Sequence, residues 1–196
     1  MGDAASLRAR AAALRAQAAE AEQQAALMGL EVGPVIFLDI DGVLNYTRSA
    51  LHINVEPQLM ARLRQIVDTT SAHIVLSTFW RNFESYIAYV LHRHGIESTR
   101  VIGRTPGCPG DVKISEVLAR SAADDHEYAG RAAEIKAWLA AHPEVDRFVI
   151  LDDRNSASDS ELSPHFVQTQ SSIGLTDKHV TEAIRILSRA RGDASS

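Results

Sequence analysis

The stretch from Val35 to Leu44 constrains the fold more than any other part of this chain. It reads V-I-F-L-D-I-D-G-V-L, so a short apolar run bounded by Pro34 leads directly into Asp39 and Asp41. Such a run is typical of a strand buried on both faces of a parallel sheet. Because open α/β sheets bind their ligands at the carboxyl ends of the strands, the sequence predicts two carboxylates at a ligand site.

An Asp-x-Asp pair can also serve as a helix cap or a turn, and the pair alone does not decide between these uses. The apolar run favours the ligand site, since a cap does not need one. Two acids this close repel each other and require a cation or a shared proton between them. Gly42 lets the chain turn sharply just after the acids.

The rest of the chain alternates further apolar strand segments with helical patterns. This alternation predicts an α/β fold with a mostly parallel sheet. The expected strands after the first are 73–77, 100–103, 148–151 and 166–167, and the expected helices start at Pro57, cover 81–94 and 131–141, and end with one capped by Thr176 or Asp177.

Several of these strands end in chemically related residues. The second strand ends in Ser77-Thr78, and the fourth ends in Asp152-Asp153. In a parallel sheet these ends lie along one edge, so the side chains are expected to meet in one crevice. Clustered carboxylates suit Mg²⁺. One carboxylate there can also act as a nucleophile, and a second can act as general acid and base.

The N-terminal stretch has a different character. Residues 4–28 carry apolar or alanine positions at a heptad spacing, which predicts an Ala-rich helix within 1–33. The alternatives are a coiled-coil homodimer through 4–28, a helix packed on its own domain, or a targeting presequence. The main domain is expected over 34–190, with a tail at 191–196.

Composition limits the class of protein. The 196 residues carry a formal net charge of -5, which argues against broad, non-specific nucleic-acid binding. The single cysteine excludes an internal disulfide, and no apolar run approaches the roughly 18 residues of a membrane span. We therefore expect a cytoplasmic protein without a membrane partner, with organellar targeting as the alternative.

The motifs in this order resemble the haloacid dehalogenase (HAD) superfamily of phosphohydrolases. The resemblance covers roughly 35–187 and implies a three-layer, Rossmann-like parallel sheet with helices on both faces. The matching motifs are Asp39-Ile40-Asp41-Gly42, Ile74-Val75-Leu76-Ser77 and Val149-Ile150-Leu151-Asp152-Asp153.

A narrower resemblance is to the HAD domains of multidomain Swiss Army Knife RNA repair proteins. It rests on Ser77-x-x-Trp80-Arg81, on Arg131-x-x-Glu134-Ile135-x-x-Trp138-Leu139, on His142-Pro143 and on Leu151-Asp152-Asp153. The chain departs from that pattern in a longer segment between Thr105-Pro106 and Arg131. Because of this departure, the resemblance alone does not identify the substrate of this chain.

The resemblance also implies roles for individual residues. Asp39 would be the nucleophile and a metal ligand, and Asp41 would be the general acid and base, with its backbone carbonyl on the metal. Ser77, Thr78, Arg81 and Arg131 would bind the substrate phosphate, and Asp152 and Asp153 would complete the Mg²⁺ site. For the cation beside the nucleophile, Arg131 is preferred to Lys113.

The segment between Asp41 and Ser77 is too short for a large cap domain, and 106–130 could form only a small insert or lid. An open site favours a bulky substrate. Together with the resemblance, this implies a Mg²⁺-dependent phosphomonoester hydrolase acting through an aspartyl-phosphate, with an RNA or DNA end as the expected phosphorylated partner. The alternatives are a small-metabolite or phosphoprotein phosphatase and a non-catalytic binding module that dimerises through the N-terminal helix.

Overall fold

The computed structural model describes residues 33–47, 52–106, 130–155 and 161–189. The chain divides into two units, Met1–Val32 and Gly33–Ser196, and every described residue belongs to the second. The predicted N-terminal helix, almost all of the 106–130 insert, Lys113 and the 191–196 tail lie outside the described residues. The domain division therefore stays a prediction.

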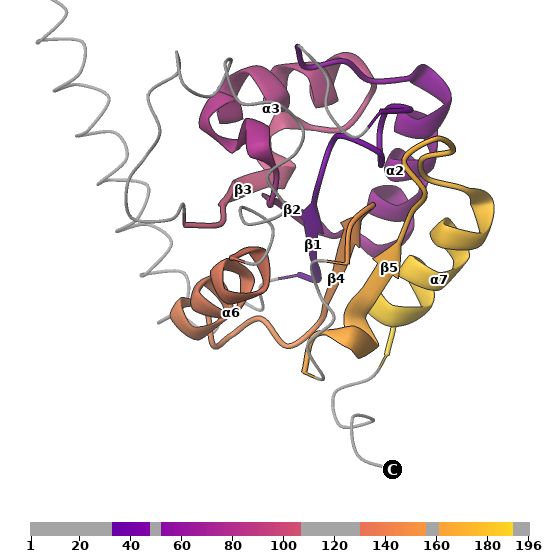
Figure 1. Ribbon diagram of the computed structural model, residues 1–196. Coiled ribbons are helices and arrows are strands. Elements are labelled where there is room, and N and C mark those ends of the chain that lie inside the picture. Colours follow the sequence, from indigo (N-terminus) through magenta and orange to yellow (C-terminus); the bar gives the residue numbers. More distant parts are fainter. Residues whose placement is uncertain (1–32, 48–51, 107–129, 156–160, 190–196) are drawn as a thin grey trace, which may run out of the picture. The chain divides into compact units, whose positions relative to one another are not determined.

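The second unit is built on a five-stranded, wholly parallel sheet (Figure 1). The strands lie in the order β3-β2-β1-β4-β5, so the apolar run that precedes Asp39 forms the central strand. Their bounds are β1 Val35–Leu38, β2 His73–Leu76, β3 Val101–Arg104, β4 Phe148–Asp152 and β5 Phe166–Gln168. The chain leaves β3 at one edge and returns on the other side of β1, which places the topological switch point between β1 and β4.

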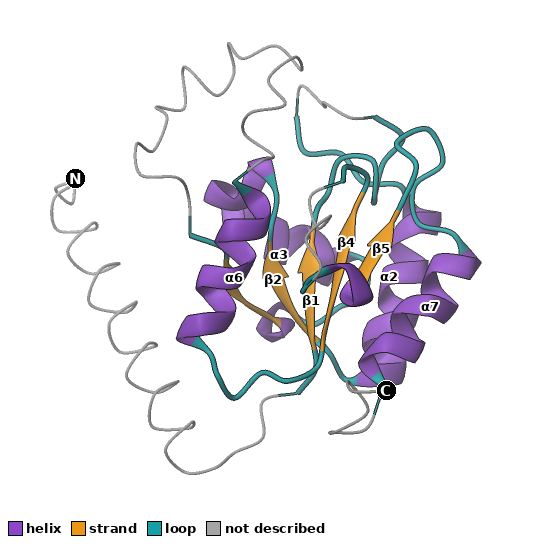
Figure 2. Cartoon of the chain, turned by 60° about the horizontal axis from the view of Figure 1, so that its bottom comes forward, coloured by secondary structure: helices purple, strands orange, loops and turns teal. Residues whose placement is uncertain are grey.

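Helices cover both faces of this sheet, as predicted. Figures 1 and 2 show α6 on one side and α2 and α7 on the other. The helices are α2 Pro57–Thr70, α3 Glu84–Arg93, α6 Arg131–Ala141 and α7 Asp177–Leu187, with the short 3₁₀ helices η1 Phe79–Phe83, η2 Ser98–Arg100 and η3 Ser163–His165. Among the helices that the structure describes, none is long and apolar enough to cross a membrane.

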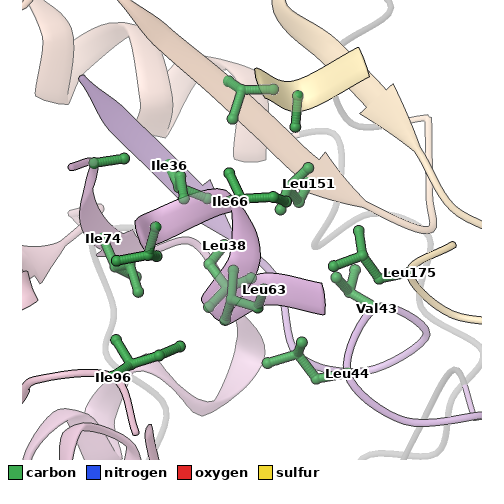
Figure 3. Close-up of a cluster of buried hydrophobic side chains, with 14 of the residues drawn as sticks. Ile36, Leu38, Val43, Leu44, Leu63, Ile66, Ile74, Ile96, Leu151 and Leu175 are labelled. Carbon is green, nitrogen blue, oxygen red and sulfur yellow. The ribbon is translucent and has the colours of Figure 1, made fainter. Parts of the chain in front are cut away.

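Alternate side chains of β1 pack against the two helical layers. Ile36 and Leu38 point into a buried cluster that also takes in apolar residues of α2, α3 and α7 (Figure 3). Phe37 points to the opposite face, where its ring meets Trp138 of α6 edge-on at a centroid distance of 5.3 Å. Burial of each apolar side chain of this size stabilises the fold by about 1.5–3 kcal/mol, so packing on both faces holds β1 in place.

The segment after β2 differs from the single helix that the sequence predicted over 81–94. The chain first forms η1, and α3 begins only at Glu84. The Thr78 side chain caps η1, because its hydroxyl oxygen accepts a hydrogen bond from the Trp80 amide at 3.4 Å. The tight turn at this cap directs Trp80 inward, where it is 4% exposed.

The loop after β1 is held by the chain that follows β5. The Thr169 hydroxyl donates to the Gly42 carbonyl at 2.8 Å, and the Leu175 amide donates to the Val43 carbonyl at 2.9 Å. Gly174 has a φ of +69°, and a Cβ there would lie 2.5 Å from Leu59 Cδ1. Glycine is therefore required for this segment to approach the loop that carries Asp41.

We expect Gly174→Ala to lower the free energy of unfolding by at least about 1–2 kcal/mol, because alanine is strained in the left-handed region and overlaps Leu59. Urea denaturation monitored by circular dichroism measures the loss. Gly33→Ala is the matched control, since Gly33 has no positive φ and its nearest neighbour would lie at 3.4 Å. Equal stability of the two variants would contradict the proposed constraint.

Candidate active site

The carboxyl ends of β1, β2 and β4 bring the predicted acids and hydroxyls together at one edge of the sheet. The hydrogen-bond ladder continues past the strands, since the Asp39 amide donates to Leu151 O and the Ser77 amide donates to Leu38 O, both at 2.9 Å. All of the gathered side chains are buried: Asp39, Asp41, Ser77, Thr78, Asp152 and Asp153. The structure therefore gathers the side chains that were expected to meet at this edge.

Three of these acids form a candidate metal centre. Carboxylate oxygens of Asp39, Asp152 and Asp153 all lie within 4.8 Å of one another, and all three residues are buried. Hard oxygen donors at this spacing fit Mg²⁺, which is held in proteins by carboxylates together with water and phosphate oxygens. The Asp41 side chain is not part of this cluster.

Gly42 allows Asp153 to reach the loop after β1. Its φ is +71°, and a Cβ at this position would lie 2.5 Å from Asp153 Cγ. Glycine thus serves both the turn that the sequence predicted and a close contact that the sequence did not reveal. The contact links the metal-cluster end of β4 to the loop that carries Asp41.

Arg131, the first residue of α6, lies between two of the clustered acids. Its Nη1 atom is 2.9 Å from Asp39 Oδ2 and 2.5 Å from Asp152 Oδ2, and its side chain is 5% exposed. The structure therefore places the cation preferred on sequence grounds directly against the predicted nucleophile. Lys113, the rival, is outside the described residues.

The electrostatics of Asp39 follow from this packing. Burial raises the pKa of Asp39 from its ordinary 3.8 to about 7. The Arg131 guanidinium acts in the opposite direction, the neighbouring Asp152 carboxylate raises the pKa further, and a hydrogen bond from the Thr78 side chain lowers it. A further positive charge at the acid cluster would favour the ionised form.

Asp41 is held differently, by two neutral donors that sequence reasoning missed. The Asn45 side-chain amide donates to Asp41 Oδ1 at 2.7 Å, and the Trp80 indole N–H donates to Asp41 Oδ2 at 3.1 Å. Asn45 is fixed in turn, because its Oδ1 accepts from the Gly42 amide at 2.9 Å. Trp80 therefore both packs in the core and positions an acid.

The two hydroxyls differ in their contacts. Ser77 Oγ is buried and has no hydrogen-bond partner within the part of the chain that the structure describes. A buried hydroxyl in this state costs stability unless a ligand oxygen or water satisfies it. Thr78 caps η1 and contacts Asp39, as described above. Ser77 is thus available to donate to a bound oxyanion.

Arg81, predicted to contact a phosphate, is engaged by α6. Its Nη2 lies 3.3 Å from Glu134 Oε1, and its Nη1 donates to the Thr78 carbonyl at 3.2 Å. The other Glu134 oxygen accepts from the Thr105 hydroxyl at 3.2 Å. Glu134 lies one turn after Arg131, so this network joins η1 to the helix that carries the Asp39 partner. A phosphate contact for Arg81 stays a prediction.

Comparison with known proteins gives one family. The model described as "HAD domain in Swiss Army Knife RNA repair proteins" matches residues 35–180, which include every site residue described above. Neither the curated proteins nor the solved structures contain a match to this chain.

The acid cluster predicts a metal response that does not depend on turnover. We expect Mg²⁺ to raise the melting temperature, because binding to the folded state alone adds about 2.7 kcal/mol at a free concentration of 100 times Kd. Asp153→Asn removes one cluster carboxylate and should abolish most of the shift. Asp68→Asn, an exposed acid of α2, should leave it intact. Differential scanning calorimetry with and without Mg²⁺ measures the shift in melting temperature. An equal shift in both variants would refute the metal site.

Proposed function

This chain belongs to the family of HAD domains found in Swiss Army Knife RNA repair proteins, and on that premise we propose that it hydrolyses phosphomonoesters through an aspartyl-phosphate. We further propose that it uses Mg²⁺ and acts on polynucleotide ends. The observation that carries the proposal is the different setting of the two acids after β1. Asp39 pairs with Arg131 within the acid cluster, whereas Asp41 accepts hydrogen bonds from the Asn45 amide and the Trp80 indole.

In the first step, an Asp39 oxygen attacks the phosphorus atom of the substrate. A bond forms between that oxygen and phosphorus, the bond from phosphorus to the leaving oxygen breaks, and Asp41 gives its proton to the leaving oxygen. Arg131 beside Asp39 and the buried Ser77 hydroxyl would hold the phosphoryl oxygens as negative charge develops. The products are the free alcohol and a phosphorylated Asp39.

In the second step, water attacks the phosphorus of phosphorylated Asp39. Asp41, now ionised, takes a proton from the water, and the bond between the Asp39 oxygen and phosphorus breaks. Inorganic phosphate leaves, and both acids return to their starting states. Asp41 must therefore exchange a proton with two different oxygens, which suits a side chain that is held in place by hydrogen bonds from outside the acid cluster.

Asp39, Asp152 and Asp153 would hold Mg²⁺, which when bound supplies positive charge that offsets both the clustered carboxylates and the phosphoryl oxygens. Arg131 already supplies part of that charge at Asp39 and Asp152. Two sources of positive charge are consistent with a dianionic phosphoryl group as the ligand.

The short connection between β1 and Ser77 bears on the substrate class. Apart from residues 48–51, the chain between the acids of β1 and Ser77 consists of a loop, α2 and β2. The described residues of that stretch therefore contain no cap domain. The absence of a cap domain from the described residues of that stretch, together with the RNA repair context of the matching family, supports a polynucleotide end as the substrate.

We expect Asp39→Asn to reduce phosphate release on the order of a thousandfold or more, because the amide is a poor nucleophile. The release of inorganic phosphate is measured from an aryl phosphate, from RNA with a 3′- or 5′-phosphate, from sugar phosphates and from nucleotides. Circular dichroism verifies folding, and Asp68→Asn is the control. Undiminished release by Asp39→Asn would refute the mechanism, and a preference for sugar phosphates would refute the proposed substrate.

The indole of Trp80 is expected to matter through Asp41. Trp80→Phe keeps the ring contacts with Phe79 and Phe83 but removes the donor to Asp41 Oδ2. We expect kcat/KM for an alkyl phosphate to fall about tenfold, the cost of one hydrogen bond that orients the acid during the first step. The kcat/KM for p-nitrophenyl phosphate should change little, since its acidic phenol leaves without a proton and this ratio does not include the second step.

Asp41→Asn supplies the reference for that experiment, because it removes the acid itself and should show a larger dependence on the leaving group. An equal loss on both substrates in Trp80→Phe would mean that the indole serves only packing.

A further inference from the structure

Two exposed tyrosines stand out on α3. Among the described residues, the exposed large hydrophobic side chains are Tyr46, Tyr86, Tyr89 and Ile173. Tyr86 and Tyr89 are three residues apart in one helix, so they lie on the same face, and they are 52% and 56% exposed. The opposite face of α3 carries Ile87 and Leu91 into the core. Packing within the described unit therefore does not account for the two rings.

The segment that contains this face is basic, although the chain as a whole is acidic. Residues 79–104 contain four arginines and two glutamates, in a chain with a formal net charge of -5. Arg93 is exposed one helical turn after Tyr89. At the other end of α3, the exposed Arg104 donates to Asn82 Oδ1 at 2.9 Å, and Glu84 is its acidic neighbour at 3.9 Å.

The same end of α3 begins at the active site. The helix follows η1 directly, and η1 is capped by Thr78 and carries Trp80, which donates to Asp41. Arg104 also donates to the Arg81 carbonyl at 3.2 Å, so it lies on the connection between the site and α3. In chain order, η1 leads from Trp80 to Tyr86, Tyr89 and Arg93 on α3, and Arg104 contacts the residues at the start of that helix.

We propose that this surface, which we call the α3 face (Tyr86, Tyr89, Arg93 and Arg104), binds the single-stranded part of a polynucleotide. The inference rests on the proposed function, because the phosphorylated end of the same strand would occupy the active site. Every nucleotide base offers a flat face to a tyrosine ring, and arginines bind the backbone phosphates.

Spacing supports this occupant. Residues three apart on a helix have Cβ atoms about 5–6 Å apart, so the two rings can meet the bases of adjacent nucleotides in an unstacked single strand. An acidic peptide could use the arginines, but it would lack the succession of planar rings that the two tyrosines match. The polynucleotide is therefore the occupant that uses all four side chains.

The test is fluorescence anisotropy with a labelled single-stranded RNA of about twelve nucleotides that lacks terminal phosphates, so that binding does not require the reaction. We expect the double variant Tyr86→Ala/Tyr89→Ala to raise Kd at least about tenfold, given the usual strength of base stacking on aromatic side chains. Tyr86→Phe/Tyr89→Phe keeps the rings and should stay within about threefold of wild type.

Charge is tested separately. Arg93→Gln should remove one phosphate contact and therefore reduce the slope of log Kd against log salt concentration by about 1. Arg185→Gln, an exposed arginine of α7, is the matched control and should leave the dependence unchanged. Poly-glutamate is the competitor that represents an acidic peptide, and it should displace the RNA only weakly.

Kinetics then separate this inference from the proposed function. The double alanine variant should raise KM for a phosphorylated oligonucleotide and leave aryl phosphate hydrolysis unchanged. Unchanged RNA affinity in that variant, or equal affinity for poly-glutamate, overturns the α3 face even if hydrolysis depends on Asp39. If RNA binding depends on the tyrosines but no hydrolysis depends on Asp39, the proposed hydrolytic function is refuted and the proposed binding role of the α3 face is supported.

Discussion

The contact on which the site depends is the buried guanidinium of Arg131 between Asp39 and Asp152. Three acids in one buried cluster would repel one another, and burial of charge without a partner is costly. Arg131 offsets part of that repulsion, yet burial still holds the pKa of Asp39 well above its ordinary value. The arrangement is possible only because β1 and β4 are neighbours at the switch point and α6 delivers its first residue there.

The two acids that follow β1, Asp39 and Asp41, have different partners. Arg131 pairs with Asp39 and Asp152, while Asp41 receives hydrogen bonds from the amide of Asn45 and the indole of Trp80. Two acids only two residues apart thus experience different environments. Such a difference is what allows neighbouring carboxylates to take different roles in one reaction.

The η1 segment connects these environments to the rest of the domain. A 3₁₀ helix has about three residues per turn, so consecutive side chains diverge strongly. Thr78 contacts Asp39, Trp80 contacts Asp41, and Arg81 contacts Glu134 on α6. The same short segment then leads into α3 and its exposed tyrosines, which makes it the structural link between the site and the proposed binding surface.

The sequence by itself determined the parallel sheet, the reactive residues at the ends of its strands and the resemblance to the family. Buried parallel strands appear as continuous apolar runs, and residues at their ends must meet at one edge, so Asp39, Ser77 and Asp152 could be placed together without coordinates. The helices at Pro57 and Arg131 were predicted at the correct starting residues, because proline and helical periodicity are local signals.

Only the tertiary structure decided which partners hold these residues. Trp80 and Asp41 are 39 positions apart, and Arg81 and Glu134 are 53 apart. No local periodicity encodes a hydrogen bond between side chains so distant in sequence. The helix expected over 81–94 is present, but its first residues form a 3₁₀ turn for the same reason, because the cap at Thr78 and the burial of Trp80 override the α-helical pattern at its start. Chain propensities specify elements, whereas packing selects the contacts between them.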